Sequence, residues 1–250
     1  LHLRTRRQRQ MCIRDSHAGM AASNGIEAAK LSKLGFVSRE DGIECDQGFF
    51  LTHGWDKKTP SRALDNLGTD FLFPEIKYKF HACCHGLHSF LEALEELKQE
   101  NNFNPESIEE IAIETNPSWL KVCNIQEPKT GLESKFSYKL TAAMSIYGKD
   151  TADLGTYNDD ICFDDKMNNI RDKVKVIPND QLSNTQSLIS IKDGSKDIKN
   201  KHDLSDKIDQ NILETKIVNK SASLLSKNKS NEISEMLNAP SEIKVYSLVD

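Results

Sequence analysis

The chain has 250 residues and a mass of 28.2 kDa, which is enough for one large domain or two small ones. Its net charge of −5 gives no electrostatic reason to expect nucleic-acid binding, and no stretch approaches the roughly 20 apolar residues that span a bilayer. The six cysteines form no CxxC motif, and no apolar signal-peptide core is visible. We therefore expect a cytoplasmic protein with reduced thiols that binds neither nucleic acid nor membrane.

Residues 1–16 differ in composition from the rest of the chain. They carry five arginines, whereas the remainder uses lysine for almost all of its positive charge. The stretch resembles the translation of a DNA adapter used in sequencing libraries, so we predict that natural sequence begins near His17. A basic nucleic-acid arm or a transit peptide is the alternative interpretation of the same residues.

Three helices are predicted in the first hundred residues. Residues 18–34 combine alanine and lysine with a repeating apolar face, and Gly35 follows at the expected end of the helix. A glycine-punctuated connection over 37–55 leads to a short helix over 60–67. The strongest pattern covers 77–101, where leucine and phenylalanine recur at helical spacing and Glu and Lys occupy the opposite face.

Strands and helices alternate in the next hundred residues. A turn over 104–107 precedes the alternating apolar residues of a strand. The predicted strands are 108–115, 174–177 and 188–191, the last closed by an Asp193-Gly194 turn. The predicted helices are 135–147 and 163–174.

The composition changes after Asp180, where Ser, Asn, Lys and Asp dominate. A disordered tail is one interpretation of this composition. We favour a folded, lysine-rich tail, because apolar residues still recur at helical spacing between Ile212 and Leu225 and again between Ile233 and Leu237.

The segment from Lys79 to His88 is the first candidate site. It holds three histidines, two thiols and a lysine within ten residues at an expected helix start. Unsatisfied N–H groups at a helix start attract anions, a lysine adds positive charge for a carboxylate, and histidine serves as an acid or base near neutral pH. The residues thus indicate acid–base chemistry on an anionic substrate.

Other interpretations of this segment stay open. Cys84, His85 and His88 have a spacing that zinc sites also use, although no second ligand cluster appears elsewhere in the chain. Cys84 is alternatively a nucleophile, but no dedicated base is evident. A purely structural helix start, with Cys83 and His88 buried by packing, is the remaining interpretation.

Two further positions are candidates for contact with an anion. His17 precedes a small residue at a helix start, and Lys135 opens another predicted helix. An ordinary cap at His17 and a solvated helix start at Lys135 are the alternatives. The chain has no dinucleotide-binding, P-loop, zinc-protease or serine-hydrolase motif, so ordinary side chains are left to carry the chemistry.

Four segments, in order, resemble blocks of the MmgE/PrpD family. They are HAGMAASNGIEAAKLSKLGF from His17, IECDQGFFLTHG from Ile43, KFHACCHGLHSFLEAL from Lys79 and ESKFSYKLTAAMSIYG from Glu133. The third is similar to the family's most recognisable motif, in which a lysine, a cysteine and a terminal histidine lead into a helix. The resemblance extends from residue 17 to about residue 248.

The resemblance implies an α+β fold, with a mainly helical domain that is incomplete here and a smaller α+β lid domain. It also implies a homodimer without a cofactor or metal, and an active site between the two domains. The implied division is a leader over 1–16, the remainder of the helical domain over 17–70, the lid over 71–195, and C-terminal helices returning to the helical domain over 196–250.

The site residues that the resemblance implies fall into two groups. The catalytic group is Lys79, Cys84 and His88, and the substrate-binding group is His17, His85 and Lys135. Departures from the family pattern include Leu87 in place of threonine and Phe80-His81-Ala82 in place of a proline-containing stretch.

The implied activity is that of a lyase for small polycarboxylates, and dehydration of a 2-methylcitrate-like hydroxy acid in propionate catabolism is the expected reaction. Decarboxylation of cis-aconitate and epimerisation of a dicarboxylate are alternatives within the family, and a non-catalytic relative is the alternative outside it. Because the family's other catalytic residues lie upstream of this sequence, we expect this chain to be inactive by itself.

Overall fold

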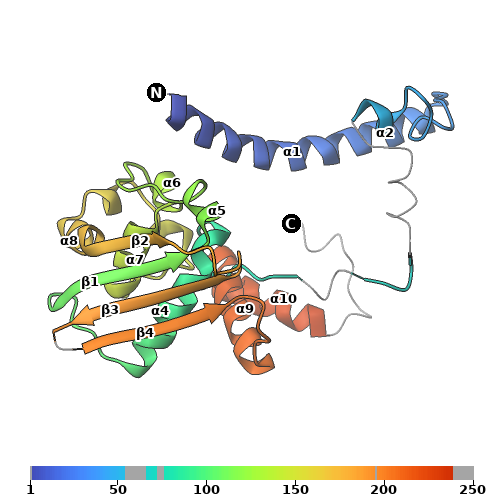
Figure 1. Ribbon diagram of the computed structural model, residues 1–250. Coiled ribbons are helices and arrows are strands. Elements are labelled where there is room, and N and C mark those ends of the chain that lie inside the picture. The colour runs from blue at the N-terminus through green and yellow to red at the C-terminus, as the bar shows by residue number, and fades with distance from the viewer. Residues whose placement is uncertain (1, 54–65, 72–75, 195, 239–250) are drawn as a thin grey trace. The chain divides into compact units, whose positions relative to one another are not determined.

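The computed structural model describes residues 2–53, 66–71, 76–194 and 196–238 (Figure 1). The chain divides into two compact units, Leu1–Pro74 and Glu75–Asp250. None of the helices in the described ranges has both the length and the apolar character that a membrane span requires.

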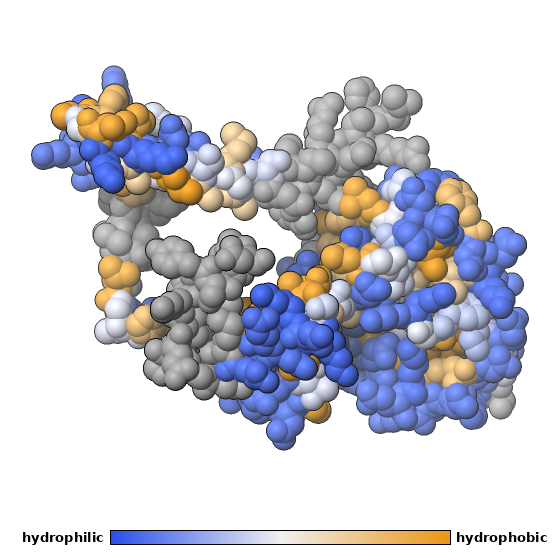
Figure 2. Space-filling view, turned by 180° about the vertical axis from the view of Figure 1, so that it is seen from behind, coloured by the Kyte–Doolittle hydropathy of each residue, from blue (hydrophilic) through white to orange (hydrophobic). Residues whose placement is uncertain are grey.

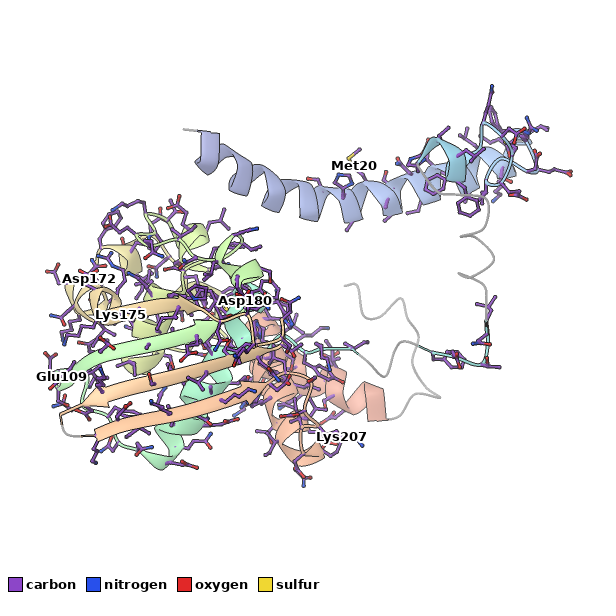
Figure 3. All side chains as sticks on the ribbon, in the orientation of Figure 1. Met20, Glu109, Asp172, Lys175, Asp180 and Lys207 are labelled. Atoms are coloured by element: carbon purple, nitrogen blue, oxygen red, sulfur yellow. The ribbon has the colours of Figure 1, made fainter. Side chains whose placement is uncertain are left out.

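The first unit is dominated by one long helix, α1, over His2–Lys33. The predicted helix over 18–34 is therefore confirmed but begins too late, because the helix continues through the arginine- and glutamine-rich residues before it. Gly35, with φ +85°, follows its end in the left-handed conformation that glycine tolerates best. Met20 projects from this helix with 63% of its surface exposed (Figure 3).

A single helical turn, α2 over Phe49–Thr52, interrupts the connection predicted over 37–55. It follows Gly48, whose Cα lies so close to the backbone of Ile43 that a Cβ would come within 2.7 Å of the carbonyl oxygen. Most of the short helix predicted over 60–67 lies outside the described residues.

A four-stranded mixed sheet forms the second unit together with the helices that pack on it, which confirms the α+β class (Figure 1). Its order is β2-β1-β3-β4, with β1 and β2 parallel and the other neighbours antiparallel. The bounds are β1 Ile108–Thr115, β2 Val174–Pro178, β3 Gln186–Asp193 and β4 Lys196–Asp203. The three strands predicted from sequence correspond to β1, β2 and β3.

Strand β4 was not predicted, because residues 196–203 are mostly charged and were expected to open the C-terminal helical segment. Pairing with β3 from Asp193↔Lys196 to Gln186↔Asp203 supplies its hydrogen bonds. Helix α4, over His88–Glu100, supports it from one face: the Asn200 side chain donates to Ala93 O at 3.1 Å. The strand thus depends on neighbours, and its own side chains give little strand signal.

The helix predicted over 77–101 forms only in its second half. Residues 76–84 contain no helix, and a 3₁₀ turn over His85–Leu87 precedes α4. The segment is extended because its backbone N–H groups bond to distant carbonyls, from Ala82 to Thr151 at 2.8 Å and from Cys84 to Lys135 at 2.9 Å. These tertiary bonds take the place of the i→i−4 bonds of a helix.

The helices between the strands agree with the sequence patterns apart from their first residues. The region predicted as one helix over 135–147 contains α7, Tyr138–Ile146, which begins at the Ser137 cap. Helix α8, Asp165–Lys173, begins at Asp164, whose carboxylate accepts from two backbone N–H groups. Shorter elements are α5 Pro117–Leu120, α6 Gly131–Ser134 and the 3₁₀ turns Leu154–Thr156 and Asp160–Cys162. The turn predicted over 104–107 is confirmed by the bond from Ser107 N to Asn104 O.

The core lies where α4, α7 and α8 meet the sheet. Its largest fully buried side chains include Phe90, Leu94, Ile111, Tyr138 and Ile189. On the face that Figure 2 shows, hydrophilic residues cover most of the second unit and hydrophobic residues are scattered among them.

The tail after Asp180 is folded within the described residues, as predicted. It forms β3 and β4, and then α9, Gln210–Leu225, and α10, Lys227–Asn238. The apolar residues that predicted α9 remain largely exposed, including Ile212 at 53% and Leu224 at 51%.

We expect Leu94→Ala to destabilise the full chain by about 2–5 kcal/mol, because Leu94 is fully buried and its truncation leaves a cavity between α4 and the core. Urea unfolding followed by circular dichroism measures this loss. Leu154→Ala is the matched control, since Leu154 is 49% exposed and its truncation should change the free energy of unfolding little. Equal losses in the two variants would contradict the core assignment.

Candidate functional site

The candidate site is built around the extended segment 79–84 and the start of α4. The two backbone bonds to Thr151 and Lys135 fix this segment against the turn after α7 and the end of α6. The Tyr157 hydroxyl also donates to Thr151 O, at 3.1 Å. Segments about 70 residues apart in the chain therefore hold the site together.

A buried carboxylate links three parts of the unit. The His81 ring contacts Thr151 Oγ1 through Nδ1 at 2.7 Å and Glu92 Oε1 through Nε2 at 3.2 Å. The other oxygen of Glu92 accepts from Lys216 of α9. Burial by itself would raise the pKa of Glu92, but the contacts with His81 and Lys216 hold this pKa at about 2. The carboxylate is therefore ionised and connects the loop, α4 and α9.

His88, the first residue of α4, is fully buried. Among the described residues, neither ring nitrogen has a hydrogen-bond partner. Its ring centroid lies 5.1 Å from that of His81 and 5.4 Å from that of His85. Burial, together with these rings and Lys79, lowers the pKa of His88 to about 2, so the imidazole is neutral.

His85 is half-buried beside His88 and thus gives the histidine cluster access to solvent. Burial and then the charge of Lys79 lower the pKa of His85, so this ring also favours the neutral form. Trp119 covers the neighbouring Gly86 closely: a Cβ at Gly86 would lie 2.5 Å from the indole ring. The 3₁₀ turn over His85–Leu87 therefore requires glycine at position 86.

The thiols of the segment differ in their surroundings. Cys83 is buried, and burial raises the pKa of its thiol to about 12, which makes it a poor nucleophile. Cys84 is half-buried and interacts with the buried Cys123, and this interaction and burial raise the pKa of Cys123. The nucleophile interpretation was made for Cys84, and it stays a prediction.

Lys135 lies at the end of α6 and contributes to the site in two ways. Its carbonyl accepts from Cys84 N, and its ammonium lies 5.7 Å from the centroid of the Tyr157 ring. Lys79 is exposed, and its charge acts on His85, His88 and Cys83. The structure thus brings Lys79, Cys84, His85, His88 and Lys135 into one neighbourhood.

His17 is the one predicted site residue that belongs to the first unit. It lies within α1 in the Leu1–Pro74 unit, where its side chain is exposed. It does not stand at a helix start as the sequence suggested, because α1 begins fifteen residues earlier, at His2.

Sequence reasoning missed Glu92, Thr151 and Lys216. Glu92 was placed on the solvated face of its helix, yet only 5% of it is exposed. Lys216 lies 124 residues after Glu92 and contacts it directly, and Thr151 lies 59 residues after Glu92 and is connected to it through the His81 ring. No local pattern could have revealed a network between such distant segments. Among the described residues, no group of three or more His, Cys, Asp or Glu side chains is arranged to hold a metal ion.

Comparison with known proteins gives the family. The chain matches the MmgE/PrpD C-terminal domain over residues 81–239, which is more than half of its length. The chain belongs to the MmgE/PrpD family. The match begins at His81 and includes the histidine cluster, the sheet and the C-terminal helices α9 and α10.

A curated relative in this family is similar over a shorter stretch. The cis-aconitate decarboxylase-like protein oryM of Aspergillus oryzae (strain ATCC 42149 / RIB 40) is 34% identical over 95 residues. The alignment covers 36% of this chain and 20% of the relative, so the chain spans only a fifth of that protein.

We expect the buried His88 to make folding sensitive to acid. The unfolded state takes up the histidine proton near pH 6.5, whereas the folded state resists it down to about pH 2, so stability falls as pH decreases below 6.5. Between pH 7.5 and 4.5 this contribution amounts to about 2–3 kcal/mol.

Urea unfolding of the full chain at the two pH values tests whether stability falls with decreasing pH. On acidification, the free energy of unfolding of His88→Leu should fall by about 2–3 kcal/mol less than that of the parent, because the variant has no buried imidazole whose protonation differs between the folded and unfolded states. His17→Leu, at an exposed position, is the control and should keep the parent slope. An unchanged pH dependence in His88→Leu would show that this imidazole is not held neutral.

Proposed function

We propose that the protein carrying this chain is a cofactor-independent lyase for small polycarboxylates, and that it dehydrates a 2-methylcitrate-like hydroxy acid. The observation that supports this most directly is the cluster of three histidine rings beside Lys79, at the start of α4. A neutral, half-buried imidazole such as that of His85, next to fixed positive charge, can take a proton from an anionic substrate.

In this proposal, Lys79, His85 and Lys135 bind the substrate carboxylates. Neutralising these carboxylates is what makes removal of the adjacent proton feasible, because negative charge develops as that proton leaves. His17 of the first unit is proposed to add a further contact.

Proton transfer is assigned to Cys84 and His88. A base takes the proton next to a carboxylate, and an acid protonates the departing hydroxyl, so the products are an alkene and water. His88 is fully buried and its ring nitrogens have no hydrogen-bond partner among the described residues, so we propose that it exchanges a proton only when bound substrate draws the half-buried His85 ring, whose centroid lies 5.4 Å away, into hydrogen-bond distance. Cys84, half-buried next to this ring, is proposed to assist on the solvent side.

Decarboxylation of a cis-aconitate-like substrate is the second candidate. It is supported by the name of the curated relative, which is called cis-aconitate decarboxylase-like. The same carboxylate-binding lysines would serve this reaction, in which a carbon–carbon bond to a carboxylate breaks, CO₂ leaves, and an acid of the site adds a proton to the resulting carbanion. A homodimer in the cytoplasm is the assembly and location that we propose for either reaction.

The reaction is tested by proton NMR in D₂O with the protein expressed from the complete natural reading frame that contains residues 17–250. The substrates offered are 2-methylcitrate, citrate, cis-aconitate and iminodisuccinate. We expect an alkene product from 2-methylcitrate; loss of CO₂ from cis-aconitate would instead favour the second candidate. If no substrate turns over and no proton exchanges with solvent, the lyase proposal fails and a non-catalytic relative takes its place.

Lys79→Ala in the same protein should lower kcat/KM by about 10- to 100-fold, since hydrogen bonds to charged groups contribute about 1.5–3 kcal/mol. Lys77→Ala is the matched control, because Lys77 is an exposed lysine two residues away. Normal kinetics in Lys79→Ala would remove Lys79 from the site.

A further inference from the structure

A pocket of about 700 Å³ lies between the middle and end of α4, the turn over 148–152 and the C-terminal helices. Volumes of this size are typical of sites for small molecules. Lys79, Cys84 and His88 do not line it, although Phe80 and His81 do. The pocket is therefore adjacent to the histidine cluster but separate from its proposed catalytic residues.

Lysine dominates the charged lining of this pocket. Five lysines face three carboxylates. The lysines are Lys98, Lys149, Lys216, Lys220 and Lys227, and the carboxylates are Glu92, Glu95 and Asp150.

Two of the carboxylates are already neutralised within the fold. Glu92 is bound by His81 and Lys216, and the Glu95 carboxylate accepts from Lys98 Nζ at 3.0 Å. The remaining carboxylate, that of Asp150, accepts from the backbone N–H of Ala152 at 2.8 Å.

The lysines and carboxylates of the lining leave a net charge of +2, and three lysines stand outside the two pairs just described. Within the described residues, Lys149, Lys220 and Lys227 form no ion pair. Lys220 is half-buried, and its ammonium donates to Ala152 O at 2.6 Å. Burial lowers the pKa of Lys220, and the neighbouring carboxylates of Asp150 and Asp153 oppose this shift only in part, so a further anion beside it would stabilise its charged form.

Neutral hydrogen-bond donors complete the lining. Asn219 of α9 lines the pocket next to Lys220, and Gln99 and Asn231 contribute amide groups from α4 and α10. Oxyanions bind where positive charge and neutral donors converge in a partly enclosed space, because the lower dielectric there strengthens both interactions.

We propose that this pocket binds a small multivalent oxyanion. Lys220 is the central contact, and Lys149 and Lys227 supply charge at the rim. Two sources share this chemistry: a small polycarboxylate and a phosphate group. The assignment goes beyond the proposed lyase activity and does not require it, because it rests on other side chains.

Isothermal titration of the full chain with citrate, and separately with inorganic phosphate, tests the proposal at constant ionic strength. The test variant is Lys149→Gln/Lys220→Gln/Lys227→Gln, which removes the charge of these three lysines but keeps polar side chains. We expect at least one anion to bind the parent chain and to bind this variant about tenfold more weakly or worse.

The matched control removes the same charge outside the pocket, as Lys166→Gln/Lys175→Gln/Lys196→Gln. These lysines are exposed, and Figure 3 shows Lys175 on β2, at the opposite edge of the sheet from β4. The control should bind as the parent does.

The pattern of binding separates the sources. Tighter binding of citrate supports a polycarboxylate ligand, and tighter binding of phosphate supports a phosphate-bearing ligand; both support the pocket. No binding of either anion, or equal weakening in the control variant, overturns the proposal. Circular dichroism melts of both variants ensure that a lost fold is not mistaken for a lost site.

Discussion

The buried carboxylate of Glu92 is the interaction on which the arrangement of the second unit depends. It joins His81 of the extended segment and Lys216 of α9 to the helix that covers the sheet. A buried charge is tolerated only while its partners are in place, and removing one partner typically costs about 3–5 kcal/mol. The extended segment 79–84, α4 and α9 are thereby coupled.

This coupling also positions the histidine cluster. Because His81 is held by both Thr151 and Glu92, its ring has a fixed place beside His88. The packing of Trp119 over Gly86 restricts the other side of the same turn. The site is thus preorganised by contacts outside the proposed catalytic side chains. Cys84 takes part in these contacts only through its backbone N–H.

The histidine cluster and the lysine-rich pocket share the segment 79–84. Lys79 acts on the histidines, and Phe80 and His81 line the pocket against α9. His81 takes part in both, since its ring contacts His88 and also lines the pocket. His81 therefore connects the histidine cluster to the charged lining of the pocket.

The sequence by itself determined those elements whose signals are local. The alternating isoleucines of β1, the Asp164 cap of α8 and the helical spacing in α9 each depend on residues within a few positions of one another. The segment from Lys79 to His88 likewise indicated the histidine cluster, because its residue types lie within ten positions, and the resemblance to the family rested on four such segments in order.

Only the tertiary structure decided the features that depend on distant partners. Strand β4 exists because β3 and α4 pair with a charged segment, and α4 begins at His88 because carbonyls of Thr151 and Lys135 capture the preceding backbone. Glu92 is buried because Lys216, 124 residues later, compensates its charge. Residue patterns encode local conformation, whereas burial of charge requires partners that only folding brings together.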